Sequence, residues 1–175
     1  MKSTGVIRRI DELGRVVIPK EIRKNLEIRD GEFLEIYTDD NSVVLKKYSK
    51  MDANINLAKK VCKIINETYG YKIMITDRDK IIASEDGLYT ELIGSNITDN
   101  MKSLIDNRYS YISQNEESIT IAKKNVLGYF AMIPIIVSTD CLGLVVVFSG
   151  KPIDDTINNI LKLTVKLFEY KIDIA

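Results

Sequence analysis

The feature that most constrains the fold of this chain is the stretch 11–23, which reads Asp-Glu-Leu-Gly-Arg-Val-Val-Ile-Pro-Lys-Glu-Ile-Arg. Gly14 suits a backbone that turns sharply or takes a positive φ. The β-branched Val-Val-Ile run is typical of a short strand. Pro19 fits the first position of a helix, because its missing N–H needs no partner there. The stretch therefore predicts a turn, a strand over Arg15–Ile18 and a short helix over Lys20–Leu26.

Three further strands are predicted around this stretch. One covers Thr4–Ile10, and two more, Phe33–Thr38 and Val43–Tyr48, form a hairpin through the turn residues 39–42. Short strands and one short helix bury too little apolar surface to be stable alone. Because their edges would be unpaired, we expect residues 1–50 to pair with a second copy of the chain.

Charge is unevenly distributed in this region, although the formal net charge of the whole chain is zero. Residues 1–24 hold seven basic and three acidic side chains, a net charge of +4, whereas residues 25–50 hold four basic and six acidic, a net charge of −2. Such segregation is typical of a nucleic-acid-binding surface, and a dimer would double it. A solvated basic face without a partner is the alternative.

Three segments carry a resemblance to a known family: Lys2–Gly5, Asp11–Pro19 and the hairpin Leu34–Tyr48. They resemble the DNA-binding domain of the AbrB-type transition-state regulators, part of the AbrB/SpoVT family. The resemblance implies a swapped-hairpin β-barrel, in which two chains exchange hairpins and form an intertwined homodimer. Its expected partner is double-stranded DNA.

The resemblance also implies which residues contact DNA. The matching basic positions are Arg8, Arg15, Arg23 and Lys24, with Lys2, Arg9 and Lys20 as auxiliary phosphate contacts. Arginine binds phosphates and guanine edges through a bidentate fork, or enters a narrow minor groove. Lysine at position 24 keeps the charge without the fork, which favours a phosphate contact. Arg9 and Lys20 fit equally well as solvated side chains that cover the barrel.

The second part of the chain follows a short polar stretch, 51–54, which we expect to be a linker between domains 1–50 and 55–175. Its apolar periodicity and turn signals predict a helix, two strands, a crossover with helical pieces, three strands and a final helix begun by Pro152. The predicted bounds are Ile55–Tyr69, Lys72–Thr76, Lys80–Ala83, 85–107, Ser118–Ala122, Gly128–Val137, Leu142–Phe148 and Ile153–Ile172.

This order of elements is typical of a GAF- or PAS-like α+β sensor domain with an antiparallel sheet. The whole chain resembles members of the AbrB/SpoVT family in which a GAF-like sensor domain follows the DNA-binding domain. The terminal helices have broader apolar faces than one sheet requires, which indicates a homotetramer formed through residues 55–175.

A pocket for a small-molecule effector is a further expectation. We expect it under the crossover, lined by Tyr71, Ile73, Ile75, Tyr129, Phe130 and Met132. Ordinary core packing is the alternative for these residues, since apolar strand residues need no ligand to explain them.

Several classes of function are excluded or disfavoured by composition. The chain has no histidine, and its two cysteines, Cys62 and Cys141, fit buried reduced thiols. Histidine-based catalysis and histidine- or cysteine-based metal sites are therefore not expected. Neither of the glycine-rich phosphate-binding motifs occurs in the sequence, and no cofactor is expected. No apolar run is long enough for a membrane span, and no signal peptide is expected, which favours a cytoplasmic, nucleoid-associated protein.

The predicted function is that of a sequence-selective DNA-binding transcription regulator, not an enzyme, acting on sporulation or stationary-phase genes. The second domain would sense an effector, form tetramers, or do both. Two alternatives remain open at this point. One is an architectural DNA-bridging protein whose second domain only oligomerises. The other is an antitoxin of the MazE type, which shares the swapped barrel but usually carries a short disordered tail.

Overall fold

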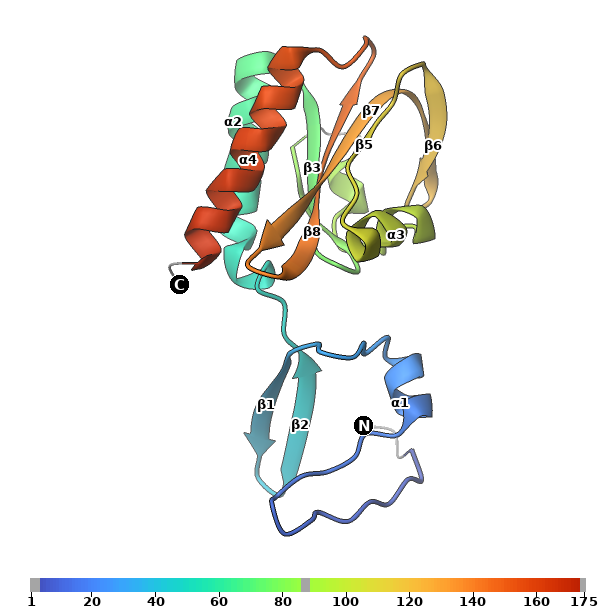
Figure 1. Ribbon diagram of the computed structural model, residues 1–175, viewed down its shortest axis with the longest axis vertical. Coiled ribbons are helices and arrows are strands. Elements are labelled where there is room, and N and C mark those ends of the chain that lie inside the picture. The colour runs from blue at the N-terminus through green and yellow to red at the C-terminus, as the bar shows by residue number, and fades with distance from the viewer. Residues whose placement is uncertain (1–3, 86–88, 174–175) are drawn as a thin grey trace. The chain divides into compact units, whose positions relative to one another are not determined.

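The computed structural model describes residues 4–85 and 89–173, and the chain divides into two compact units between Tyr48 and Ser49. Residues 4–48 are called unit 1 and residues 49–173 unit 2 (Figure 1). The stretch 51–54, predicted as a linker, is packed within unit 2. Met51 is fully buried there, and the side-chain amide nitrogen Nδ2 of Asn54 donates a hydrogen bond to the Lys50 carbonyl at 2.9 Å.

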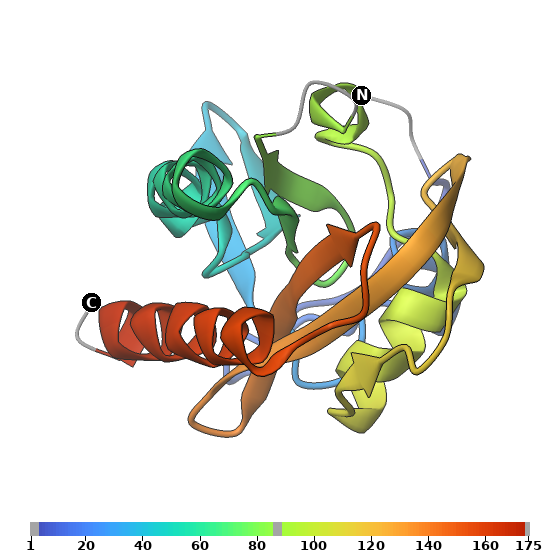
Figure 2. The ribbon, with the colours of Figure 1, turned by 90° about the horizontal axis from the view of Figure 1, so that it is seen from above.

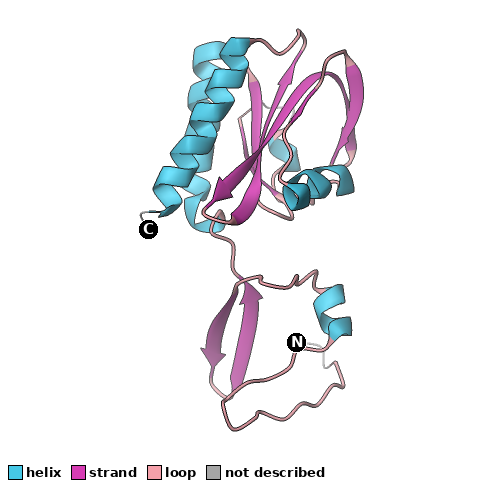
Figure 3. Ribbon diagram, in the orientation of Figure 1, coloured by secondary structure: helices cyan, strands magenta, loops and turns pink. Residues whose placement is uncertain are grey.

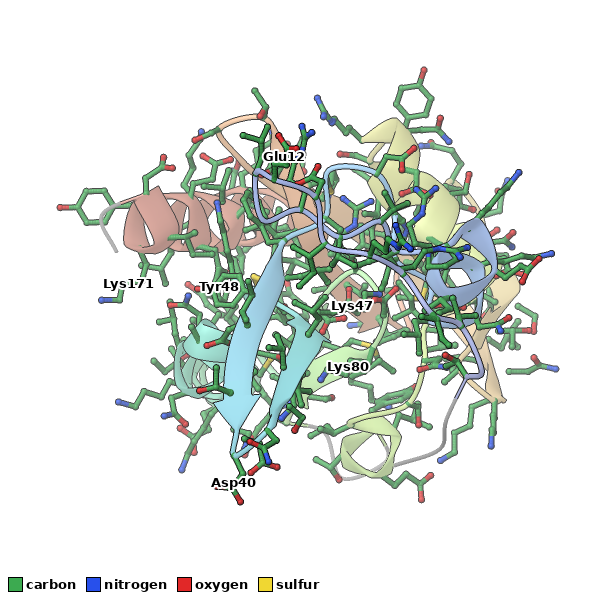
Figure 4. All side chains as sticks on the ribbon, turned by 90° about the horizontal axis from the view of Figure 1, so that it is seen from below. Glu12, Asp40, Lys47, Tyr48, Lys80 and Lys171 are labelled. Atoms are coloured by element: carbon green, nitrogen blue, oxygen red, sulfur yellow. The ribbon has the colours of Figure 1, made fainter. Side chains whose placement is uncertain are left out.

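Unit 1 contains one helix and one hairpin. Helix α1 covers Lys20–Asn25, close to the predicted bounds. Strands β1, Leu34–Asp39, and β2, Ser42–Lys47, pair antiparallel in a regular register with Asp39 opposite Ser42. Figure 4 labels Asp40, which lies in the turn between the two strands. The predicted helix and hairpin are confirmed.

The two remaining predictions for unit 1 are wrong for a single chain. Neither Thr4–Ile10 nor Arg15–Ile18 is a strand, and Figure 3 draws both segments as loop. A strand is defined by its hydrogen bonds to a neighbour, and these segments have no neighbouring strand within one chain. Their apolar side chains stay in solvent: Ile7 is 88% exposed and Val17 is 72% exposed.

Unit 2 is built on one antiparallel sheet with the strand order β4-β3-β8-β7-β5, and β6 pairs with β7 beyond this path. The strands are β3 Lys72–Thr76, β4 Ile81–Ser84, β5 Tyr111–Ile112, β6 Glu117–Ile121, β7 Lys124–Val137 and β8 Asp140–Ser149. The helices are α2 Ile55–Tyr69, α3 Asp99–Asn107 and α4 Asp155–Asp173, with short 3-10 turns η1 at Asp52–Asn54 and η2 at Thr90–Leu92.

Helices cover the sheet of unit 2 on both faces. Helix α2 packs on β3 and β4, α4 packs on β7, and α3 packs near β8 (Figures 1 and 2). The side chains of α2 and α4 share one core with one face of the sheet, while those of α3 share a second core with the other face. Strands β3 and β8 and residues 129–137 of β7 are therefore buried on both sides, which explains their nearly continuous apolar sequences.

Most predicted elements of unit 2 agree with the structure, and α2 and β3 have the predicted bounds. Strand β5 was not predicted, and β7 begins at Lys124 because residues 124–128 pair with β6. Helix α4 begins two residues later than predicted. The Asp154 carboxylate accepts the N–H of Ile157 at 2.9 Å, so Asp154 caps the helix in place of the expected proline start.

Both cysteines of unit 2 are buried and free. Burial raises the pKa of the Cys62 thiol to about 12, and it also raises the pKa of the Cys141 thiol. Since the thiolate is the reactive form, we expect neither thiol to react with iodoacetamide at pH 8 in the folded protein, and both to react after denaturation. Mass spectrometry of labelled protein checks this. Rapid native labelling of either cysteine would contradict the burial.

Candidate nucleic-acid interface

The predicted turn of unit 1 is closed by two backbone hydrogen bonds. The N–H of Asp11 donates to the Arg15 carbonyl at 3.1 Å, and the N–H of Gly14 donates to the Asp11 carbonyl at 2.9 Å. Gly14 has φ +74°, a conformation that other residues adopt only with strain. Glu12, labelled in Figure 4, lies in the same turn. The turn thus fixes the backbone at Arg15.

The Asp11 carboxylate binds both the backbone and the side chain of this turn. Its Oδ1 accepts the N–H of Leu13 at 3.0 Å and the N–H of Arg15 at 2.8 Å. Its Oδ2 accepts the Nε–H of Arg15 at 2.7 Å. The backbone N–H and the guanidinium of Arg15, with the N–H of Leu13, hold the pKa of Asp11 below its ordinary value. The Arg15 side chain remains 71% exposed.

Arg23 and Lys24 lie in the last turn of α1. Arg23 donates from Nη1 to Asp30 Oδ1 at 2.6 Å, and its Nε is shielded from solvent without a hydrogen-bond partner among the described residues. Lys24 is exposed. Basic side chains in the last turn of a helix also interact favourably with the helix dipole.

The other predicted contacts lie on the surface of unit 1. Arg8, Arg9 and Lys20 are exposed, and the one side-chain hydrogen bond of Arg8 to another described residue goes to the neighbouring Ile7 carbonyl, at 3.1 Å. Lys2 lies outside the described residues. The segment 4–10, the turn and α1 thus carry the described basic residues that the sequence singled out, and all of these side chains are exposed except Arg23, which is half-buried.

Not every basic residue of unit 1 is part of this group. Lys47, labelled in Figure 4, donates from Nζ to the Glu27 carbonyl at 3.1 Å and pairs with Glu32 at 3.3 Å. These contacts tie β2 to the segment between α1 and β1, so Lys47 has a structural role.

Sequence reasoning missed Asp11 and Asp30 as partners of the interface arginines. The sequence placed Asp11 in the predicted turn, and the Asp-Gly pair 30–31 predicted a second turn after the helix, with no contact to an arginine expected from either residue. The signal for Asp11 was its position four residues before Arg15, in a turn short enough for the two side chains to meet. Asp30 is seven residues from Arg23, and only the folded chain shows that the two side chains pair.

The predicted effector pocket is wrong, because its residues lie on opposite faces of the sheet. Ile73 and Ile75 belong to the core under α2 and α4, whereas Phe130 and Met132 belong to the core under α3. The register explains this: Val146 of β8 lies opposite both Met74 and Met132. Met74, and not its neighbours in β3, therefore shares a face with Met132.

The two tyrosines of the predicted pocket do not change this conclusion. Tyr71 packs against the α2 and α4 core, and Tyr129 is half-buried. A separate open hollow of about 570 Å³ lies between the crossover and the β6–β7 turn. It contains none of the six predicted residues, and its lining is Gly94, Ser95, Asn96, Ile97, Thr98, Asp99, Ala122 and Lys123.

Two features are absent from residues 4–85 and 89–173. No group of three or more histidine, cysteine or acidic side chains is arranged to bind a metal ion. None of the helices combines the length and the apolar character that crossing a bilayer requires.

Comparison with known proteins identifies the family. A family model described as "Stage V sporulation protein T C-terminal, transcription factor" matches residues 55–168. The chain is 37% identical to stage V sporulation protein T of Bacillus subtilis (strain 168) over 152 residues, which is 85% of each chain. It belongs to the AbrB/SpoVT family. Both units of the chain contribute to this likeness.

The AbrB protein of the same organism, named transition state regulatory protein, is another similar member of the AbrB/SpoVT family. The chain is 38% identical to it over 104 residues, 59% of this chain and 97% of AbrB. A solution structure of the N-terminal DNA recognition domain of AbrB is 59% identical and covers 28% of this chain and 92% of that domain, with a TM-score of 0.25.

Two further matches complete the comparison. A model described as "Antidote-toxin recognition MazE, bacterial antitoxin" matches residues 7–52. The crystal structure of a methyl-accepting chemotaxis protein, residues 122 to 287, is 14% identical, covers 69% of this chain and 90% of that one, and has a TM-score of 0.53. At this identity the likeness shows the fold alone, a mixed α/β arrangement.

Proposed function

We propose that two copies of this chain bind double-stranded DNA through the basic surface of their first units. As a member of the AbrB/SpoVT family, the chain is a DNA-binding transcription regulator. We assign it to sporulation or transition-state genes, because its relatives are named for those processes.

The observation that carries the proposal is the composition of the exposed surface of unit 1. The turn presents Arg15 on a fixed backbone, and α1 presents Arg23 and Lys24. Residues 1–24 hold a net charge of +4, so a dimer would bring two such surfaces to one duplex. Arg15 and Arg23 fit contacts to base edges or to a narrow minor groove, and Lys24 fits a phosphate.

The remaining basic residues complete the proposed interface. Arg8 is assigned to the same group as Arg15 and Arg23. Lys2, Arg9 and Lys20 are assigned to auxiliary phosphate contacts, which strengthen binding without selecting sequence.

Dimerisation through unit 1 is supported by its lack of a core. Among the described residues 4–48, none is buried. The exposed large apolar side chains are Val6, Ile7, Ile10, Leu13, Val16, Val17, Leu26, Phe33, Ile36, Tyr37, Val43, Leu45 and Tyr48. A second copy that exchanges hairpins, as in a swapped-hairpin barrel, would cover them and would give the segments Thr4–Ile10 and Arg15–Ile18 neighbouring strands.

Titration of labelled promoter DNA tests the proposal. Arg15→Ala or Arg23→Ala should each weaken specific binding by about 1–3 kcal/mol if the side chain reaches a base. Loss of a phosphate contact should instead reduce the slope of log K against log salt by about one unit per contact. Lys162→Ala is the matched control, because it removes one exposed positive charge from unit 2. Unchanged binding by the Arg8, Arg15 and Arg23 alanine variants would refute the interface.

Unit 2 is proposed to join two dimers into a homotetramer. Large apolar side chains remain exposed on its terminal helices, namely Ile64 and Tyr69 on α2 and Leu163, Leu167 and Tyr170 on α4. A role in effector sensing would have to use a site other than the six residues predicted from the sequence. Size-exclusion chromatography with light scattering, with and without candidate metabolites, separates a sensor from a scaffold.

The two alternative functions are less well supported. An antitoxin is disfavoured because residues 55–168 match a transcription-factor model, and the MazE model is limited to residues 7–52. An architectural DNA-bridging protein would keep the same DNA surface and would use unit 2 only for assembly. The proposed regulator acts on chromosomal DNA in the cytoplasm, and its action requires neither a cofactor nor a catalysed reaction.

A further inference from the structure

We infer that Asp11 is a positioning residue that aims the Arg15 guanidinium at DNA and thereby contributes to sequence selectivity. The inference rests on the proposed function, in which Arg15 contacts DNA. Asp11 itself is negatively charged, as the phosphate backbone of DNA is, so we do not expect it to contact DNA directly.

The Asp11 carboxylate is held in place independently of the Arg15 side chain. Oδ1 accepts two backbone N–H groups of the turn, from Leu13 at 3.0 Å and Arg15 at 2.8 Å. The Asp11 backbone is held by its own hydrogen bond to the Arg15 carbonyl. The ion pair therefore requires the ordering of only one long side chain, that of Arg15, because the Asp11 carboxylate is already immobile.

The Arg15 guanidinium keeps part of its hydrogen-bonding capacity available for DNA. Oδ2 takes the Nε–H at 2.7 Å. Within the described residues, no hydrogen bond from Nη1 or Nη2 of Arg15 is present. These two nitrogens form the end of the guanidinium fork, which is the geometry that reads the O6 and N7 atoms of guanine. Asp11 thus binds the Nε side of the guanidinium and leaves Nη1 and Nη2 available for DNA.

Glu12, the other acidic residue of the turn, differs from Asp11 in its contacts. Glu12 is exposed, and none of the hydrogen bonds or ion pairs found among the described residues involves its side chain. Each carboxylate should repel phosphates to a similar extent, but only Asp11 holds Arg15. The charge effect of Asp11 acts on any DNA, whereas its positioning effect acts only where Arg15 reads a base.

Asp11→Asn separates positioning from turn formation. Asparagine has one side-chain oxygen, which can still accept the two backbone N–H groups, and it is well suited to such turns. Its amide nitrogen then faces the Nε–H of Arg15, donor against donor, so the guanidinium is released. Asp11→Ser is a second variant, because its hydroxyl can cap the turn but offers no second oxygen to Arg15.

The experiment measures binding of the full chain to promoter DNA and to scrambled DNA of equal length, at one salt concentration. Glu12→Gln is the matched control and should tighten both affinities by the same small factor. Asp11→Asn should reduce the ratio of specific to non-specific affinity by about tenfold, and Asp11→Ser should do the same. Thermal unfolding and light scattering confirm that each variant keeps its fold and assembly.

A double-mutant cycle decides whether Asp11 acts through Arg15. In an Arg15→Ala background, Asp11→Asn should leave the ratio of specific to non-specific affinity unchanged, since no guanidinium remains to be positioned. If Arg15→Ala alone changes neither affinity, the proposed DNA contact fails. If Arg15→Ala lowers the ratio while Asp11→Asn and Asp11→Ser behave like Glu12→Gln, the contact stands and the positioning role is refuted.

Discussion

Residues 1–50 expressed alone should form a dimer whose unfolding temperature rises with protein concentration. The physical reason is that one copy of unit 1 has no buried residue among those described, so folding and association must occur together. A tenfold dilution should lower the apparent stability of such a dimer by about 1.4 kcal/mol. Light scattering and thermal unfolding at several concentrations measure both quantities. A folded monomer at micromolar concentration would refute the intertwined barrel.

A substitution in the full chain tests the same point without cutting the protein. Val17→Asp should dissociate the first units and abolish specific DNA binding, because burying an unpaired carboxylate at a dimer core costs several kcal/mol, roughly 3–5. Leu127→Asp is the matched control: Leu127 is 68% exposed, close to the 72% of Val17, but lies on β7 of unit 2. If Val17→Asp binds promoter DNA as well as Leu127→Asp, the face around Val17 is not an interface.

Unit 1 shows which parts of a fold can be predicted from one chain. Local signals sufficed for α1 and for the β1–β2 hairpin, since Pro19 and the turn at 39–42 act on their immediate neighbours. Thr4–Ile10 has the composition of a strand, yet its pairing depends on a partner that lies outside the chain. The sequence indicated an undersized core, and the structure of one copy agrees, with its apolar side chains still in solvent.

Unit 2 shows a different limit. Helix α2 was predicted with the correct bounds, because its apolar stripe is one-sided and Gly70 ends it with φ +69°. In strands β3 and β8 and in residues 129–137 of β7 both faces are buried, so the sequence has no polar alternation that would say which side chains share a face. The predicted effector pocket failed for this reason: Ile73 and Met132 are both apolar and buried, but they lie on opposite sides of the sheet.

The sequence predicted which basic residues form the candidate interface, but it did not predict the contacts that hold their side chains. Arg15 and Arg23 stood out through charge and through family resemblance. Each guanidinium is held by a carboxylate of the same chain, because the folded backbone brings the two groups together. The turn does this for Arg15 and Asp11, and the segment that follows α1 does it for Arg23 and Asp30. A spacing of four residues made Asp11 a candidate partner of Arg15, but only the folded turn shows that Asp11, and not its neighbour Glu12, holds the guanidinium.

The core of unit 2 contains a position at which a single methyl group should have a large effect. A Cβ at Gly143 of β8 would lie 2.0 Å from the Thr76 carbonyl oxygen, 2.8 Å from its carbonyl carbon and 3.0 Å from the Asp77 Cα. All three are backbone atoms, so no side chain can rotate away to make room. Gly143 is thus required by the close approach of β8 to the end of β3.

The end of β3 is also held by hydrogen bonds that resist its displacement. Thr76 accepts the N–H of Leu144 through Oγ1 at 3.1 Å, and Asp77 donates its N–H to the Lys80 carbonyl at 2.9 Å. Asp77 Oδ1 accepts the N–H groups of Asp79 and Lys80 at 2.7 Å and 2.6 Å. Moving this backbone would break several of these bonds, and Asp77 is buried, so its lost partners would not be replaced by water.

Gly143→Ala should therefore destabilise unit 2 by about 3 kcal/mol or more, and lower its unfolding temperature by roughly 10 °C. Gly150→Ala is the matched control, because its Cβ would have no neighbour within 4 Å and its φ is not in the left-handed region; its effect should stay below about 0.5 kcal/mol. Calorimetry of the two full-length variants measures the difference. Since β8 is the central strand between β3 and β7, loss of its packing should also weaken the assembly that unit 2 supports. Equal unfolding temperatures for the two variants would mean that β3 yields to the added methyl group, and that the sheet is less rigid at this contact than its hydrogen bonds imply.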